Sequence, residues 1–183
     1  MARAPVDRAG PWRFDELADL PDDGRRYEVV DGLLIVSPSP SHDHQLVGSR
    51  LLQQLAQQCP PEWDVCYEFA LPLGTDGRVP DLAVVRAGAA RGAGVYPAQP
   101  ADFGLVVEIV SPSSRKTDRF FKPVEYAEAG IPLFWRVETD PDLSLHAFSL
   151  DGTTYGEAAV VTSGGDVPAP WGSVHVDLDL MRR

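Results

Sequence analysis

The segment Phe103–Val110 (FGLVVEIV) constrains the fold most strongly, because it is apolar throughout except for Glu108. A strand with one face in water alternates polar and apolar residues, whereas a continuous apolar run predicts a strand buried on both faces. Such a strand lies inside a sheet that other elements cover on both sides. We therefore expect an α/β fold built around this segment.

Hydrophobic spacing, capping residues and proline stops predict helices on either side of this strand. They are expected over Trp12–Leu20, from the capping residue Ser41 to Pro60, and from around Arg119–Lys122 to just before Gly130. Pro123 sets the predicted start of the third helix, since proline is tolerated only near the first turn of a helix.

Runs of β-branched and aromatic residues, separated by turn sequences, predict the remaining strands of a mixed sheet. They form a hairpin at about 26–36 around Asp31-Gly32, paired strands at Trp63–Leu71 and Arg78–Arg86, and further strands at Pro132–Glu138, Leu143–Phe148 and Tyr155–Val161. The Gly- and Ala-rich segment from Ala87 to Ala101 is expected to be a mobile loop.

The length of 183 residues favours one domain over 1–183, with a core at about 12–162. No apolar run is long enough to cross a membrane, and the first twenty residues lack the apolar segment of a signal peptide. We therefore expect a soluble, cytoplasmic protein. Cys59 and Cys66 fit no disulfide framework or CxxC motif, which indicates free thiols.

The charge is uneven along the chain, although the formal net charge is −11. Residues 137–181 carry eight acids and no Lys or Arg, a composition that repels phosphate. Between Ser111 and Lys122 the balance reverses, with Arg115, Lys116 and Arg119 in a short basic stretch. From charge alone, this stretch fits a solvated loop as well as it fits a nucleic-acid contact.

Two acids, Asp81 and Glu108, interrupt predicted apolar strands. A carboxylate buried alone costs several kcal/mol, so each needs a partner or a metal. On neighbouring strands, the two could converge on one hard divalent cation such as Mg²⁺. The alternative is that each acid pairs with an arginine such as Arg78 or Arg136.

Lys122 is the second unusual residue, because Lys116 and Lys122 are the only lysines beside fourteen arginines. An ammonium group can steer a water molecule or a developing anion as a compact point charge. Lys122 is the better candidate, since it opens a predicted helix with Tyr126 one turn on. The alternative is a surface ion pair with Glu125.

Several spaced elements now resemble the Uma2 family (DUF820), restriction-endonuclease-like proteins of the PD-(D/E)XK nuclease superfamily. They are DDGRRYEVVDG at 22–32, SPSPSHDHQ at 37–45, Pro80-Asp81, VVEIVSPSS at 106–114, and the series Asp118, Lys122, Tyr126 and AGIP at 129–132. The resemblance covers most of the chain. It implies a restriction-endonuclease-like core, with a mixed central sheet flanked by helices, an N-terminal hairpin and C-terminal antiparallel strands.

The resemblance also implies roles for individual residues. Asp81 and Glu108 would ligate Mg²⁺ or Mn²⁺, with the carbonyl of Ile109 contributing, and Lys122 would be the catalytic lysine. The superfamily usually places this lysine two residues after the acid, where this chain has Val110. Lys122 must therefore reach the same place from the following helix.

Four further residues match family positions and are expected to support the site. Glu28 either reaches the metal site or pairs with Arg25 or Arg26. His44 contacts phosphate or a water at the metal, or it is a cap or surface residue. Asp118 orients Lys122 or, more simply, caps the helix, and Tyr126 lies one turn beyond Lys122.

These observations lead to a divalent-metal-dependent endonuclease that hydrolyses DNA phosphodiester bonds. Arg115, Lys116 and Arg119 would then meet the DNA backbone, and binding would be weak and salt-sensitive because the chain is acidic. One alternative is a catalytically inactive binding or assembly module with this fold. Another is a hydrolase of a different phosphate ester. Restriction-like enzymes often act as dimers, so a homodimer is a further expectation.

Overall fold

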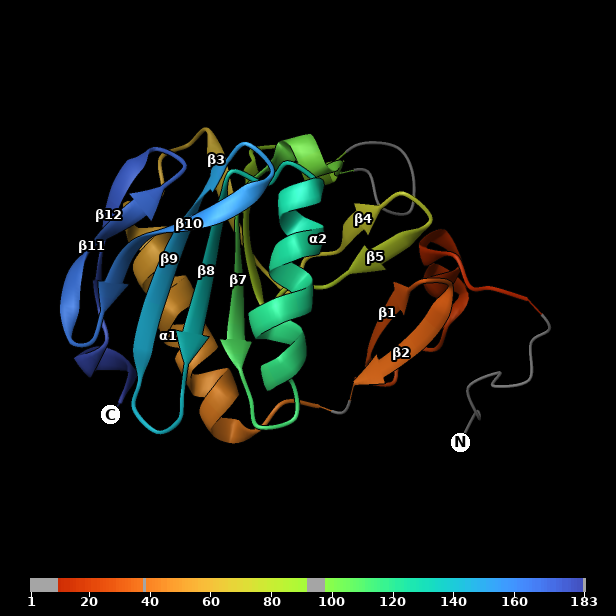
Figure 1. Cartoon of the computed structure of the whole chain (residues 1–183), viewed down its shortest axis with the longest axis horizontal. Coiled ribbons are helices and arrows are strands. Elements are labelled where there is room, and N and C mark those ends of the chain that lie inside the picture. The colour runs from red at the N-terminus through yellow and green to blue at the C-terminus, as the bar shows by residue number, and fades with distance from the viewer. Residues whose placement is uncertain (1–9, 38, 92–97, 183) are drawn as a thin grey trace.

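The computed structural model describes residues 10–37, 39–91 and 98–182. They form a six-stranded sheet, a four-stranded sheet and a two-stranded hairpin, with the four-stranded sheet set to one side (Figure 1). The loop expected to be mobile between Ala87 and Ala101 lies partly outside the described residues, which omit 92–97.

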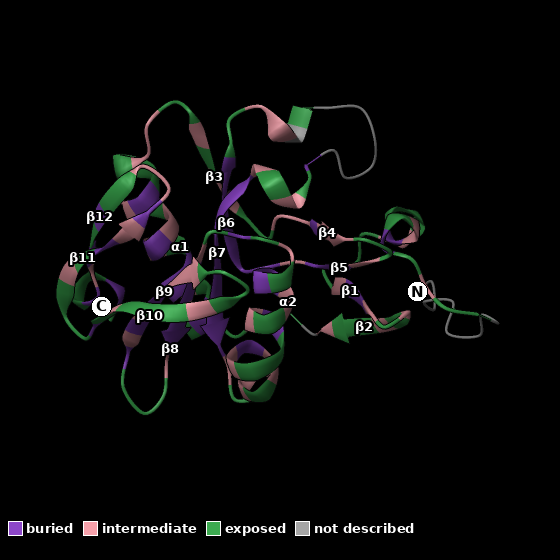
Figure 2. Ribbon diagram, turned by 45° about the horizontal axis from the view of Figure 1, so that its top comes forward, coloured by how far each residue is buried: buried purple, intermediate pink, exposed green. Residues whose placement is uncertain are grey.

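The six-stranded sheet has the order β10-β9-β8-β7-β6-β3. Its strands are β3 (Trp63–Tyr67), β6 (Leu82–Arg86), β7 (Phe103–Val110), β8 (Leu133–Glu138), β9 (Ser144–Asp151) and β10 (Thr154–Val161). β7 and β8 are parallel and the other pairs are antiparallel, so the sheet is mixed as expected. Every residue of β7 is buried, which confirms the interpretation of the apolar run (Figure 2).

Two helices cover opposite faces of this sheet, α1 (His42–Gln58) behind it and α2 (Lys122–Glu128) in front of it (Figure 1). The side chain of Ser41 accepts a hydrogen bond from the backbone N–H of His44, so α1 begins at the predicted cap. Among the described residues, no helix combines the length and apolar character needed to cross a membrane.

The second helix begins earlier than predicted. The chain is already helical at Arg115 and passes through a π-helical turn, Thr117–Phe121, before it continues as α2. Pro123 explains the wide turn, because proline has no N–H to donate to the preceding turn and its ring crowds that turn. The sequence prediction treated Pro123 as a mark of the helix start, whereas the helix accommodates it by widening.

The predicted strands Trp63–Leu71 and Arg78–Arg86 are each broken in two. Their outer parts, β3 and β6, belong to the large sheet, whereas β4 (Leu71–Leu73) and β5 (Asp76–Arg78) belong to the small sheet. Glu68 adopts a positive φ of 46° at the break, and its N–H donates to the carbonyl of Asp81 at 3.0 Å. Asp81 therefore stands at the junction of the two sheets, just before β6, and not within a strand as expected.

The small sheet has the order β2-β1-β5-β4, with β1 (Arg26–Val30) and β2 (Leu33–Ser37) forming the predicted hairpin. Asp31 and Gly32 both have positive φ, as a two-residue hairpin turn requires. The helix expected over Trp12–Leu20 is a 3-10 helix, Phe14–Asp19, that packs Phe14 and Leu17 against β1.

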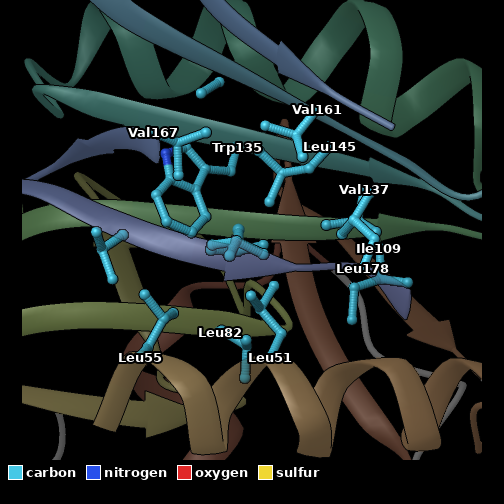
Figure 3. Packing of buried hydrophobic residues seen from close by; sticks show 14 of the residues in the cluster. Leu51, Leu55, Leu82, Ile109, Trp135, Val137, Leu145, Val161, Val167 and Leu178 are labelled. Carbon is cyan, nitrogen blue, oxygen red and sulfur yellow. The ribbon is translucent and has the colours of Figure 1, made fainter. Parts of the chain in front are cut away.

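Alternation along the strands of the large sheet divides its buried side chains between two faces. The face toward α1 carries the larger apolar cluster, in which Leu51 and Leu55 of α1 lie beneath Leu82, Ile109 and Trp135 (Figure 3). The opposite face packs against Tyr126 of α2. Glu108 lies between Ile109 and Val107 in sequence and so points to the α2 side.

The C-terminal hairpin, β11 (Gly164–Ala169) and β12 (Gly172–Asp177), closes the larger cluster next to α1 (Figure 1). Val167, Val176 and Leu178 are buried in it, so the core continues past residue 162, where it was expected to end. Side-chain amides of Gln54 and Gln58 on α1 bond to the backbone of this hairpin.

Replacing Gly104 in β7 by alanine should destabilise the protein. A Cβ atom there would lie 2.6 Å from Cζ3 of Trp63 and 2.7 Å from Cγ of Pro170, distances that force packed side chains to move. We expect a loss of about 1–3 kcal/mol in the free energy of unfolding, measured by urea denaturation. Gly156→Ala is the control, because a Cβ at Gly156 meets nothing within 4 Å. Equal stability of the two variants would contradict the packing described for β7.

Candidate metal and phosphodiester site

Asp81 and Glu108 face each other across neighbouring strands. The antiparallel ladder of β6 and β7 pairs Leu82 with Val107, so the next position out sets Asp81 opposite Glu108. Oδ2 of Asp81 also accepts a hydrogen bond from the backbone N–H of Ile109, the residue that follows Glu108. The structure therefore brings together the two acids that the sequence singled out, both almost fully buried.

Asp81 is held by three donors from three different elements. Its Oδ1 accepts a hydrogen bond from Nη1 of Arg26 at 2.6 Å, and its Oδ2 accepts from the backbone N–H of Ile109 at 2.7 Å. Nε2 of His44 lies 3.1 Å from the same Oδ2. Burial alone would raise the pKa of Asp81, but the His44 hydrogen bond and the Arg26 charge outweigh it and hold the pKa well below its usual value. Asp81 is therefore a carboxylate at neutral pH.

Glu108 is held by Lys122 and Tyr126. Nζ of Lys122 donates to Oε2 at 2.7 Å, and the hydroxyl of Tyr126 donates to Oε1 at 2.5 Å. Burial raises the pKa of Glu108 to about 8, because the charge of Lys122 only partly offsets the loss of hydration and the nearby charge of Asp81 adds to it. The two facing acids thus have pKa values shifted in opposite directions.

The π-helical turn and α2 place Asp118, Lys122 and Tyr126 on one buried face, because residues four apart lie above one another on a helix. Oδ1 of Asp118 lies 3.1 Å from Nζ of Lys122. Burial would lower the pKa of Lys122, but the charges of Glu108 and other nearby acids outweigh it and raise the pKa. Asp118 thus contacts Lys122, and the turn that begins at Thr117 has no side-chain cap hydrogen bond.

Glu28 lies beside these groups but has partners that differ from those expected. Its Oε1 accepts from the backbone N–H of Val79 at 2.9 Å and its Oε2 from Nη1 of Arg78 at 3.4 Å. Arg25 and Arg26 are not these partners. Arg78 also bonds to both carboxylate oxygens of Glu125, each at 2.7 Å.

Three pairings considered from the sequence are therefore wrong. Arg78 contacts Glu28 and Glu125 and is not the partner of Asp81 or Glu108. Arg136 pairs with Glu138. Lys122 reaches Glu108 and Asp118, while Glu125 is held by Arg78.

A cavity of about 790 Å³ lies between the two sheets, above these side chains. The start of α1, the hairpin β1–β2, the turn after β7 and the helix that follows it all contribute to its wall. Asp81, Lys122 and Glu28 line it, together with Arg26 and His44. Ser111 and Ser114 form the turn after β7, where Oγ of Ser114 accepts from the N–H of Ser111 at 3.0 Å.

The donor chemistry of the site fits Mg²⁺ or Mn²⁺. No group of three or more His, Cys, Asp or Glu side chains within the described residues is arranged to hold a metal ion. Mg²⁺ ordinarily takes only one or two carboxylates and keeps several waters, so the two carboxyl groups of Asp81 and Glu108 are enough to hold it. The backbone of Ile109 lies next to Asp81 and adds a carbonyl of the same hard character.

Two of the three basic residues in the first turns of the helix after β7 are neutralised by acids. Arg119 donates to both oxygens of Glu138, at 2.9 and 2.7 Å, and Arg115 pairs with Asp140. Nζ of Lys116 lies 5.6 Å from the ring centre of Phe121 on the rim of the cavity. Two of the three predicted phosphate contacts are thus engaged with acids.

Arg26 is the site residue that sequence reasoning missed, since it was considered only as a partner of Glu28. One signal was present: alternate residues of a strand share a face, so Arg26 and Glu28 point the same way on β1. The contact with Asp81 joins residues 55 positions apart, and local sequence does not reveal it.

The raised pKa of Glu108 predicts a pH-dependent contribution to stability. The folded protein binds this proton more tightly than the unfolded chain, so the contribution is complete below pH 4.5 and is lost as pH rises through about 8. Glu108→Gln carries no ionisable group there. Its urea midpoint should therefore change less between pH 5 and pH 9 than that of the wild type, and parallel changes in both proteins would contradict the assignment.

Comparisons with known proteins agree with this architecture. The structure is similar to the crystal structure described as "a putative nuclease belonging to DUF820" from Anabaena variabilis, with a TM-score of 0.72 and 19% identity over 93% of this chain and 97% of that chain. This likeness confirms the expected nuclease-type fold. A search among curated proteins gives no match.

The sequence profile of the Uma2 family, described as "Putative restriction endonuclease", matches residues 14–173. This span contains both facing acids, Lys122 and the elements that position them. The resemblance seen in the sequence is thereby confirmed, and the description of the family supports a nuclease-like role. The chain belongs to the Uma2 family.

Proposed function

We propose that this protein is a divalent-metal-dependent endonuclease that hydrolyses DNA phosphodiester bonds. The observation that carries the proposal is the contact between Lys122 and Glu108. These residues are 14 positions apart, yet Nζ of Lys122 lies 2.7 Å from the carboxylate that faces Asp81. Two acids and one lysine, converging at the end of the central strands, form the donor set that such hydrolysis requires.

Asp81 and Glu108 would hold the metal, with the carbonyl of Ile109. A divalent ion bound there supplies Lewis-acid stabilisation of the charge that develops on the phosphoryl oxygens. The protein contributes a preorganised position for that ion, because Asp81 is fixed by a backbone N–H and His44 on one of its oxygens. Such preorganisation is a large part of catalytic electrostatics.

Lys122 would act as a fixed positive charge and donor. Its raised pKa keeps it protonated at neutral pH, which suits orienting a water molecule and stabilising a developing anion better than removing a proton. Asp118 and Tyr126 restrict its position, one by an ion pair and the other by occupying the second oxygen of Glu108. The catalytic role follows from this orientation.

One observation favours a second candidate, a catalytically inactive binding or assembly module. Each facing carboxylate already has a cationic partner, Arg26 for Asp81 and Lys122 for Glu108. Without turnover, these pairs would simply satisfy two buried acids. This candidate predicts that the protein binds no divalent ion.

The lysine assignment is tested with Lys122→Met, and Lys116→Met serves as a matched control. Removing a preorganised charge from the reacting groups should lower the rate of Mn²⁺-dependent nicking of supercoiled plasmid by about 100-fold or more. Lys116→Met removes the other lysine, on the rim, and should change the rate by only a few fold. Thermal melts of both variants establish that each is folded. Full activity in Lys122→Met would refute the assigned role.

Metal binding separates the two candidate functions. Calorimetric titration of wild-type protein with Mn²⁺ at low salt should show binding, and Asp81→Ala should lose it, because a principal carboxylate ligand is gone. Absence of both binding and cleavage in the wild type would favour the binding module. If Asp81→Ala cleaved plasmid at the wild-type rate, the active site would lie elsewhere.

A further inference from the structure

Arg26 occupies the oxygen of Asp81 that a metal ion would need. Oδ2 of Asp81 is taken up by the N–H of Ile109 and by His44. Within the described residues, the hydrogen bond to Oδ1 comes from Arg26, at 2.6 Å. Because Oδ2 is fixed by the backbone, Oδ1 is the oxygen that can change its partner.

The position of Arg26 allows such a change. It is the first residue of β1, its side chain is 20% exposed, and it lines the cavity beside Asp81. Its Nε is buried without a hydrogen-bond partner, so the guanidinium is only partly satisfied where it lies. An arginine whose N–H groups were all hydrogen-bonded would be harder to displace.

The alternative anion for the displaced guanidinium is close by. The charges of Glu108 and Glu28 both raise the pKa of Arg26. Glu28 shares with Arg26 the face of β1 that looks into the cavity. Arg26 can therefore move away from Oδ1 of Asp81 and still be attracted by the other acids of the site.

We propose that Arg26 is a displaceable counterion, which holds Asp81 in the metal-free protein and competes with a divalent cation for Oδ1. This inference rests on the proposed function, because it assumes that Asp81 is a metal ligand. Two cations cannot share one carboxylate oxygen at contact distance without strong repulsion. Metal affinity is then set partly by the cost of moving Arg26, and Arg26 is a positioning residue that keeps Asp81 ionised and ordered until metal arrives.

The test is a Mn²⁺ titration at pH 8 of the wild type, Arg26→Met and Arg26→Lys, followed by calorimetry. Arg26→Met removes the competing charge at similar side-chain length and should bind Mn²⁺ about tenfold more tightly, as relief of about 1.4 kcal/mol of competition would give. Arg26→Lys keeps a cation and should stay close to the wild type. Arg25→Met is the control, because the adjacent Arg25 pairs with Asp23 outside the site.

Thermal melting gives a second readout that does not depend on catalysis. Without metal, Arg26→Met should melt below the wild type, since buried Asp81 loses its counterion, and Mn²⁺ should raise its melting temperature by more than that of the wild type. If Arg26→Met does not fold, Arg26→Gln makes the same test, because it removes the charge and keeps a hydrogen-bond donor.

Each outcome bears on the inference. Equal or weaker Mn²⁺ binding by Arg26→Met, with normal binding by the wild type, would overturn the role of Arg26 and leave the proposed function standing. Absence of Mn²⁺ binding by the wild type and all variants would overturn both. If Arg25→Met bound Mn²⁺ as tightly as Arg26→Met does, the gain in affinity would come from the loss of any nearby positive charge, and the inference would be rejected.

Discussion

The hydrogen bond from Lys122 to Glu108 is the interaction on which the rest of the site depends. Glu108 lies near the end of a strand that is otherwise apolar and buried throughout, where an unpaired carboxylate is costly. Lys122 and Tyr126 satisfy both of its oxygens from one helix face. The helix after β7 must therefore dock in one register over the sheet, and the π-helical turn before Pro123 provides that register.

The break in the hairpin between β3 and β6 has a comparable effect on Asp81. If these strands continued unbroken, the tip of the hairpin would extend the large sheet and Asp81 would be one more strand residue. Because the tip turns into the small sheet, a cavity opens at the junction, and β1 brings Arg26 to Asp81 while α1 brings His44. Residues from three elements meet there only because the chain changes sheets at Asp81.

Local pattern was enough to find the central strand, the hairpin around Asp31-Gly32, the capped helix after Ser41, and Asp81, Glu108 and Lys122 as unusual residues. These features depend on periodicity, capping and charge in an apolar setting, all of which are local. Partner choice is not local. Glu28 accepts a hydrogen bond from Arg78 and not from Arg26, which lies two residues away on the same strand. Arg78 comes from β5, the strand that pairs with β1, and the sequence near Glu28 does not reveal this pairing.

The charge of the cavity links metal and substrate in the proposed function. Its wall carries the acids Glu28, Asp31, Asp81, Asp118 and Glu125 against the bases Arg26, Arg78 and Lys122. Such a wall is net acidic and by itself repels a phosphodiester, and Arg115 and Arg119 add little because each is paired with an acid. A divalent cation held by Asp81 and Glu108 would cancel this excess of two negative charges and place a local positive charge at the site. Substrate binding in this family member should therefore depend on the metal for attraction as well as for chemistry, which a basic cleft would not require.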